Sequence, residues 1–157
     1  MTKTRVVIKD VPVDPENQSA FKRSLTQVVR EIFEEFGGGA KILKTSRDVY
    51  LKPNAIDAKR FCHTRPEVLE AVIRYFLDVG ANNVYIIENS TQGNYTRLVF
   101  EANGYADICK QTGARPIFLD EERTERFEFR GQPPAKDSPS VGYDLTTVEM
   151  SSTVVRE

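Results

Sequence analysis

An apolar run at residues 83–87, VYIIE, places the strongest constraint on how this chain can fold. Successive side chains of a strand point to opposite faces of a sheet, so a strand with consecutive apolar residues has to be covered on both faces. Strands of this kind are typical of parallel sheets, whose crossover connections are usually helices. The run therefore predicts an α/β fold with a buried parallel strand at 83–87.

The segments on either side of this run alternate between strand patterns and helix patterns, as a parallel sheet requires. Short β-branched or apolar runs predict further strands at 5–9, 48–52 and 115–119. Apolar residues at helical spacing predict helices from Asp14 to Phe36, from Pro66 to Asp78, and around Val99 and Ile108. We therefore expect a three-layer, Rossmann-like sandwich, which is a mostly parallel sheet with helices on both faces.

The length of 157 residues fits a single domain. We expect one α/β domain over residues 1–157, with its core in residues 1–120 and a less regular part in residues 121–157. Residues 131–144 contain three prolines, two glycines and two serines, which predicts a loop. FEF at 127–129 and pieces of 145–156 are prone to form strands. Because the sequence stops without a polar tail, we expect a fragment or a shortened version of a longer protein.

The charge distribution argues against two classes of partner. The net charge is −1, and acidic and basic residues are interleaved, so no broad positive field attracts nucleic acid or an anionic membrane. No segment approaches the roughly 20 apolar residues of a membrane-spanning helix. We therefore expect neither nucleic acid nor a membrane as a partner.

The cysteine content points to a reducing environment. The chain has two cysteines, Cys62 and Cys109, which is too few for a secreted disulfide scaffold. We therefore expect a cytoplasmic location. Two thiols are also too few for a four-cysteine iron–sulfur cluster, so no iron–sulfur cluster is expected in this chain.

Polar residues follow the predicted strands at the position where ligands bind in parallel sheets. The carboxyl ends of such strands share one edge, and a crevice there is the usual ligand site. Lys52 and Asn54 stand at the end of one strand, Glu88 and Ser90 at the next, and Asp120 at the last. Lys52 also fits an exposed surface lysine, and Asn54 also fits a residue that caps its own turn.

The start of the helix at 66–78 adds a second element to this edge. Residues 64–67, TRPE, form a capping box in which Thr64 accepts a hydrogen bond from the Glu67 N–H. Two interpretations remain open. The box only caps the helix, or the helix N-terminus holds a phosphate or carboxylate together with Lys52 and Arg65.

The loop that begins at Glu88 has the form of a turn that cradles an anion. Ser90 and Thr91 offer hydroxyl groups there, beside backbone N–H groups, although the loop also fits a plain connection to the next helix. Glu88 and Asp120 could ligate Mg²⁺, which needs one or two carboxylates plus substrate oxygens, or they could be solvated acids. Zinc is not expected, because His63 is the only histidine.

Taken in order, these motifs resemble the domain of unknown function 362 family. The motifs are Leu51-Lys52-Pro53-Asn54, Thr64-Arg65-Pro66-Glu67, the Glu88-Asn89-Ser90 turn and Gly104-Tyr105, within residues 1–120. The resemblance implies an α/β domain. Many relatives carry an added ferredoxin-like module with cysteine-rich cluster motifs, which this chain lacks. The Asp of the family's strand-end motif appears here as Glu88-Asn89.

Two main interpretations of function follow. The first is a site for a small anionic molecule at the carboxyl edge of the sheet, assisted by Mg²⁺ on Glu88 and Asp120. The second is a non-catalytic module that docks with an iron–sulfur or redox partner, or that forms a homo-oligomer. A shortened remnant with little activity is a third. No Ser/His/Asp or Cys/His set has the spacing of a covalent nucleophile, so the sequence leaves open whether the chain is an enzyme.

Overall fold

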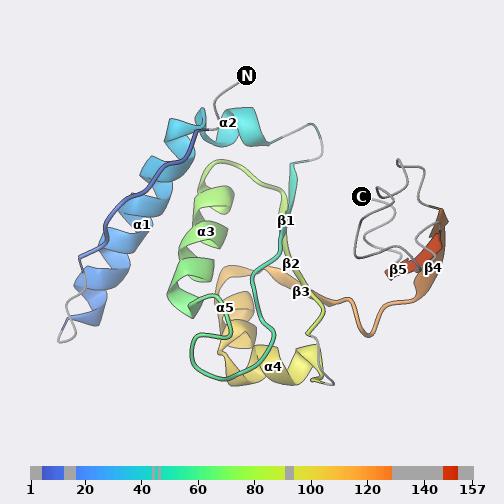
Figure 1. Cartoon of the computed structure of the whole chain (residues 1–157). Coiled ribbons are helices and arrows are strands. Elements are labelled where there is room, and N and C mark those ends of the chain that lie inside the picture. Colours follow the sequence, from blue (N-terminus) through green and yellow to red (C-terminus); the bar gives the residue numbers. More distant parts are fainter. Residues whose placement is uncertain are drawn as a thin grey trace, which may run out of the picture. The chain divides into compact units, whose positions relative to one another are not determined.

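A sheet of three short parallel strands forms the centre of the fold (Figure 1). The strands are β1 (Asp48–Leu51), β2 (Asn83–Glu88) and β3 (Arg115–Phe118), in the order β1-β2-β3. Both pairs are parallel, with Tyr50 opposite Tyr85 and Ile87 opposite Ile117. The apolar run at 83–87 is therefore the central strand, and three of the four predicted strands are confirmed.

The structure is a computed structural model, and it describes residues 5–12, 17–43, 45, 47–90, 94–128 and 147–151. The chain divides into two compact units, Met1–Phe118 and Leu119–Glu157. The first contains the parallel sheet and the helices, and the second contains a strand pair. Each unit is described by itself, and the expectation of one domain over 1–157 stays a prediction.

Five helices belong to the described part of the first unit. They are α1 (Gln18–Glu35), α2 (Gly38–Ile42), α3 (Pro66–Asp78), α4 (Thr96–Ala102) and α5 (Tyr105–Thr112). α3 packs between α1 and the sheet, and α5 packs against α3, α4 and β3 (Figure 1). The bounds of α3 are those that the sequence predicts, because its proline start and apolar spacing are both clear.

The core lies where α3, α4 and α5 meet one face of the sheet. Val84 and Ile86 of β2 point into it, together with Ile73, Phe100 and Tyr105 from the helices. The alternate residues of β2 are only partly buried. On that second face the rings of Tyr50 and Tyr85 stack, with centroids 4.8 Å apart. The fold is mixed α/β as expected, whereas the three-layer sandwich stays a prediction.

The predicted strand at 5–9 is wrong. Residues 5–12 form neither helix nor strand, and they run along α1 (Figure 1). Arg5 donates a hydrogen bond to the backbone carbonyl of Glu35 at 2.7 Å, and Lys9 pairs with Glu31 at 3.4 Å. Val6 and Ile8 remain 75% and 85% exposed. The charged residues of the segment therefore bind α1, and its apolar residues do not enter the sheet.

The glycines at 37–39 follow the end of α1 and permit a close helix contact. Gly37 adopts a positive φ of 101°, a conformation that glycine alone reaches without strain. A Cβ on Gly39 would lie 2.3 Å from Cγ2 of Val79, at the end of α3. α1 itself begins at Gln18, where the side chain of Asn17 accepts from the Ala20 N–H at 3.0 Å. The predicted start at Asp14 lies outside the described residues.

The second unit contains an antiparallel strand pair. β4 (Thr124–Glu128) pairs with β5 (Thr147–Ser151). This agrees with the strand tendency of FEF at 127–129 and of residues 145–156. The predicted loop at 131–144 lies outside the described residues. Within the described part of the chain, no helix is both long enough and apolar enough to cross a membrane.

Candidate functional site

Lys52 and Glu88 meet at the carboxyl edge of the sheet. Lys52 directly follows β1, and Glu88 is the last residue of β2, so the parallel pairing brings both to the same side. The Lys52 Nζ lies 2.8 Å from Oε1 and 3.0 Å from Oε2 of Glu88. Glu88 is only 3% exposed, whereas the Lys52 side chain is 59% exposed. The sequence therefore correctly predicted that these two residues share one edge.

The Glu88 carboxylate also accepts two backbone hydrogen bonds. The Ala55 N–H donates to Oε2 at 3.0 Å, and the Asn89 N–H donates to Oε1 at 2.8 Å. Each oxygen therefore has two donors, one from Lys52 and one from the backbone. These hydrogen bonds replace those that a carboxylate loses to water when it is buried.

This arrangement bears on the expected magnesium site. A cation at Glu88 would have to displace the Lys52 ammonium, which occupies both oxygens. Among the residues that the structure describes, no group of three or more His, Cys, Asp or Glu side chains is placed to hold a metal ion. Asp120 belongs to the second unit, so a shared role for Glu88 and Asp120 stays a prediction.

Asn54 and Thr64 close the neck of the loop that joins β1 to α3. The Asn54 N–H donates to Oγ1 of Thr64 at 3.0 Å, and the Thr64 N–H donates to the Asn54 carbonyl at 2.7 Å. The Asn54 side chain donates to the Cys62 carbonyl at 3.2 Å. Ala55 and His63 form an isolated antiparallel bridge in the same neck. Both predicted ligand residues therefore hold the loop, and Asn54 does so as a turn residue.

The predicted capping box at 64–67 is wrong. The N-cap of α3 is Arg65, and no side chain caps the helix. The Thr64 hydroxyl instead accepts from Asn54, because the loop neck brings that donor within reach. The Arg65 guanidinium lies 4.9 Å from the ring centroid of Phe21 in α1, and its Nε donates to Glu67 at 3.3 Å. Arg65 therefore contacts α1 as well as its own helix.

Ser90 connects the end of β2 to the same loop. Its Oγ donates to the Ala55 carbonyl at 2.6 Å, and its N–H donates to Oγ1 of Thr96 at 2.8 Å. Ser90 is 6% exposed and Thr96 is fully buried. The Ser90 hydroxyl therefore has an internal structural contact. Thr91 lies outside the described residues.

Tyr105 contacts the loop between β1 and α3, His63 lies within it, and the sequence patterns assign neither residue to a site. Tyr105 is fully buried, and its hydroxyl donates to the Thr64 carbonyl. Burial, together with the negative charge of Glu88, raises the pKa of Tyr105 to about 12. His63 packs edge to face on Tyr105, with centroids 6.5 Å apart. Its Nδ1 is buried without a hydrogen-bond partner among the described residues.

Little in the sequence points to the contacts of these two residues. Tyr105 stands out only as part of the Gly104-Tyr105 pair, which resembles a family pattern. A lone histidine such as His63 is a poor candidate for a zinc ligand. Tyr105 lies 41 residues from its partner Thr64, so its contact depends on how α5 packs against the loop. No spacing along the chain encodes such a contact.

Comparison with known proteins gives one result. The sequence model of the family described as "Domain of unknown function (DUF362)" matches residues 49–147, which is more than half of the chain. No curated protein and no solved structure matches the chain. The matched range includes all but the first residue of β1, the loop between β1 and α3, β2, and Tyr105. The chain therefore belongs to the DUF362 family.

Proposed function

We propose that the carboxyl edge of β1 and β2 binds a small anionic group, a phosphate or a carboxylate, with Lys52 as the principal cation. The main support for this proposal is that the Lys52 ammonium is held in position and is also exposed. Glu88 holds it at 2.8 and 3.0 Å, yet 59% of the side chain is exposed. An ammonium has three N–H donors, so one remains for a ligand after Glu88 has accepted two.

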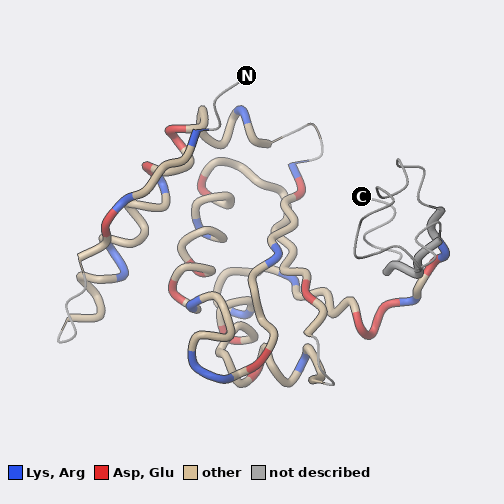
Figure 2. Tube along the Cα trace, in the orientation of Figure 1, with Lys and Arg blue, Asp and Glu red and all other residues tan. Residues whose placement is uncertain are grey.

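The local charge supports an anion in spite of Glu88. The segment 52–65 contains four basic residues, Lys52, Lys59, Arg60 and Arg65, and one acid, Asp57. Figure 2 shows the basic residues of the chain in blue and the acidic residues in red. Lys59 pairs with Asp57 at 3.2 Å. When Glu88 and Glu67, the partner of Arg65, are also counted, the basic residues exceed the acidic ones by one (four against three). A ligand that carries negative charge is therefore favoured over a cation.

The proposed role of the site is binding and charge stabilisation. Lys52 follows β1 directly and precedes Pro53, which restricts the backbone of Lys52 to extended conformations. The backbone of Lys52 is therefore restricted by Pro53, and its ammonium is held by Glu88. A fixed cation stabilises negative charge on a ligand without first having to reorient. Magnesium assistance through Glu88 and Asp120 has less support, because Lys52 occupies the Glu88 oxygens.

Thermal unfolding with inorganic phosphate tests this proposal. A ligand that binds only the folded state raises the Tm, so phosphate should raise the Tm of the wild-type chain in a saturable way. Lys52→Ala should reduce the rise, because it removes the cation of this site. Lys41→Ala removes an exposed cation of α2 and serves as the matched control, which should keep the rise. An equal rise in all three proteins, or none in the wild type, would contradict the proposal.

A second candidate function is self-association through the tip of the loop between β1 and α3. Phe61 is 86% exposed and has a φ of 68°, a conformation that is strained in residues other than glycine. The Arg60 guanidinium lies 4.7 Å from its ring centroid. An exposed aromatic ring beside an arginine is a frequent anchor of protein interfaces.

We propose a second copy of this chain as the occupant, because a basic tip complements a chain with a net charge of −1. Sedimentation velocity over a range of concentrations should then show a dimer. Phe61→Ser should yield a monomer, whereas Leu98→Ser, which removes another exposed apolar side chain, should not. A wild-type protein that stays monomeric throughout the range would exclude this function.

Two finer features belong to the same proposal. We propose a cytoplasmic location, which is supported by Cys62 and Cys109 being free thiols. We also propose that the parallel sheet is the centre of a three-layer, Rossmann-like arrangement, which is supported by the parallel order β1-β2-β3 and by the apolar sequence of β2.

A further inference from the structure

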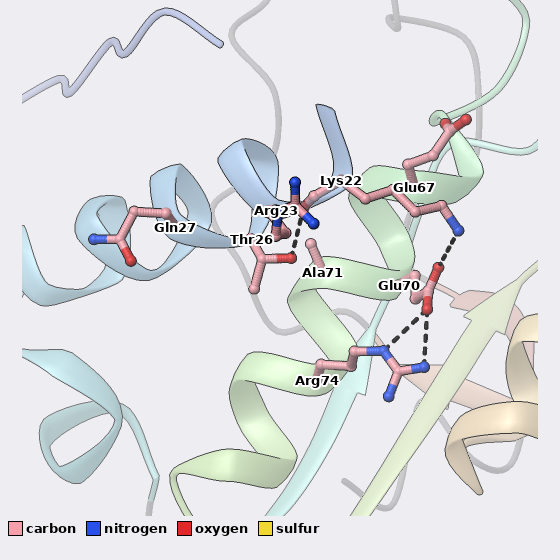
Figure 3. A pocket seen from close by; sticks show the side chains of 8 residues that line it. All are labelled: Lys22, Arg23, Thr26, Gln27, Glu67, Glu70, Ala71 and Arg74. Carbon is pink, nitrogen blue, oxygen red and sulfur yellow. Dashed lines mark hydrogen bonds and ion pairs between the residues drawn. The ribbon is translucent and has the colours of Figure 1, made fainter. Parts of the chain in front are cut away.

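A groove of about 320 Å³ lies between α1 and α3. Figure 3 shows side chains from both helices around it. Lys22, Arg23 and Thr26 come from α1, and Glu70 and Arg74 come from α3. None of these residues belongs to the Lys52 site, and the sequence patterns predicted no site here.

The lining of the groove selects a polar ligand. Among the described residues that line it, Ala71 is the only apolar one, and it is 4% exposed. A small side chain at this point leaves a hollow between the two helices. The hydrocarbon stems of the lysine, arginine and glutamine side chains also form part of the wall, and the charged groups at their ends favour a ligand with a polar group. The volume is at the lower end of ligand sites, so it suits a small polar molecule.

Glu70 fixes two cations at the wall of the groove. Lys22 Nζ lies 3.1 Å from its Oε2, while Arg74 donates to its Oε1 from Nε and Nη2, both at 2.9 Å (Figure 3). Burial raises the pKa of the Glu70 carboxyl, but the hydrogen bonds from Arg74 and Lys22 outweigh it, so the pKa lies below its ordinary value of 4.5. The carboxylate therefore stays charged and keeps both cations in place.

Arg23 adds a third cation. Its side chain is exposed, and it has no hydrogen-bond or ion-pair partner in the described ranges of the chain. The lining thus holds three basic residues against Glu70 and Glu67, and Glu67 accepts from Arg65 at 3.3 Å. The groove keeps an excess of one positive charge (three minus two). Arg23 has all of its guanidinium donors available for an oxyanion.

We propose that the α1–α3 groove binds a small polar molecule through a carboxylate or phosphate group held by Arg23, Lys22 and Arg74. Lys22 and Arg74 each have donors that Glu70 does not use. Their positions are set by Glu70 before the ligand arrives, which lowers the ordering cost of binding. This site is separate from the Lys52 site, and neither proposal depends on the other.

Amide chemical shifts of the full chain test this inference, with inorganic phosphate and citrate as separate probes. At least one probe should shift amides of residues 22–27 and 67–74 in a saturable way, and the tighter probe identifies the preferred anion. Arg23→Gln should weaken this binding about tenfold, because it removes a charged hydrogen-bond donor. Arg23 is exposed and has no hydrogen-bond or ion-pair partner among the described residues, so the variant should keep the wild-type Tm.

Two controls separate the groove from other causes. Lys41→Gln, which removes an exposed cation outside the groove, should leave binding unchanged. Lys52→Ala should also leave the shifts of 22–27 and 67–74 unchanged. The inference is overturned if neither probe shifts these amides, if Arg23→Gln binds as tightly as the wild type, or if Lys41→Gln weakens binding equally.

Discussion

Oε2 of Glu88 accepts a hydrogen bond from the backbone N–H of Ala55 at 3.0 Å, although the two residues lie 33 positions apart. This contact joins the end of β2 to the loop that follows β1. Ser90 strengthens the connection, because its hydroxyl donates to the Ala55 carbonyl at 2.6 Å. Both backbone polar groups of Ala55, which is fully buried, are therefore bound by side chains from the end of β2.

Glu88→Ala should destabilise the chain by roughly 2–4 kcal/mol, because it leaves the N–H groups of Ala55 and Asn89 without their acceptor. Lys52 loses its partner but is exposed enough to be hydrated. Urea unfolding measures the change in the free energy of unfolding. Glu101→Ala removes an exposed acid and should change it by less than about 0.5 kcal/mol. Equal changes in the free energy of unfolding for the two substitutions would show that the hydrogen bonds of Glu88 do not stabilise the fold.

Tyr105 should ionise near pH 12, since burial and then the charge of Glu88 raise its pKa to about 12 from an ordinary value of 10.0. The folded state holds the proton more tightly than the unfolded state. The stabilising contribution is therefore fully present below pH 10 and is lost as the pH rises through about 12. Absorbance at alkaline pH, with Tyr105→Phe as the subtracted reference, measures this titration.

Glu88→Gln separates the two causes of that shift. It removes the negative charge but leaves Tyr105 buried, so the pKa should fall while remaining above 10.0. An unchanged pKa in Glu88→Gln would mean that the charge of Glu88 does not reach the phenol.

The two thiols should differ in reactivity. Burial raises the pKa of the Cys109 thiol to about 11, and Cys109 is 5% exposed. Cys62 is partly exposed. Because the thiolate is the reactive form, iodoacetamide at mildly alkaline pH should modify Cys62 well before Cys109, as peptide mass spectrometry would show. Both should react in concentrated guanidinium chloride, and equal rates in the folded chain would contradict the burial of Cys109.

Gly39→Ala should destabilise the chain by roughly 2 kcal/mol, because the new Cβ would lie 2.3 Å from Cγ2 of Val79. Gly113→Ala is the matched control, since Gly113 has a φ of 79° but open space around a Cβ. Backbone strain alone should cost it about 1 kcal/mol. Val79→Gly removes the Val79 Cβ, which would lie 2.5 Å from the new Cβ, as well as both methyl groups. Adding it should reduce the effect of Gly39→Ala, and a double-mutant cycle without coupling would refute the steric explanation.

The parts of the fold that could be read from the sequence are those with strong local patterns. Pro66 and the apolar spacing after it fix α3 at its observed bounds, and the run at 83–87 identifies the central strand. The segment 5–9 has an equally good strand pattern, yet it lies along α1. A strand forms only beside a neighbouring strand. Arg5 and Lys9 instead make contacts with α1, and the alternation of residues in segment 5–9 does not predict these contacts.

The sequence predicts that Lys52 and Glu88 meet, but not the contacts around them. Parallel strands bring their carboxyl ends together, so the meeting of Lys52 and Glu88 follows from strand order. The contact of Thr64 does not follow from strand order. Its hydroxyl could accept from the N–H of Glu67 or from that of Asn54, and in the structure it accepts from Asn54. The contact of Tyr105 and the shape of the α1–α3 groove depend on how helices from distant segments pack, and no local sequence pattern predicts this packing.

The NMR resonance of the Lys52 ammonium reports directly whether Lys52 binds an anion at the edge of the sheet. A lysine ammonium held by Glu88 should give a sharp ¹⁵Nζ signal, assigned by its absence in Lys52→Ala. Inorganic phosphate or a carboxylate should shift this signal in a saturable way, with the amides of Asn54 and Asn89 moving in parallel. A Lys52 signal that neither anion moves would contradict the proposal that Lys52 binds an anion.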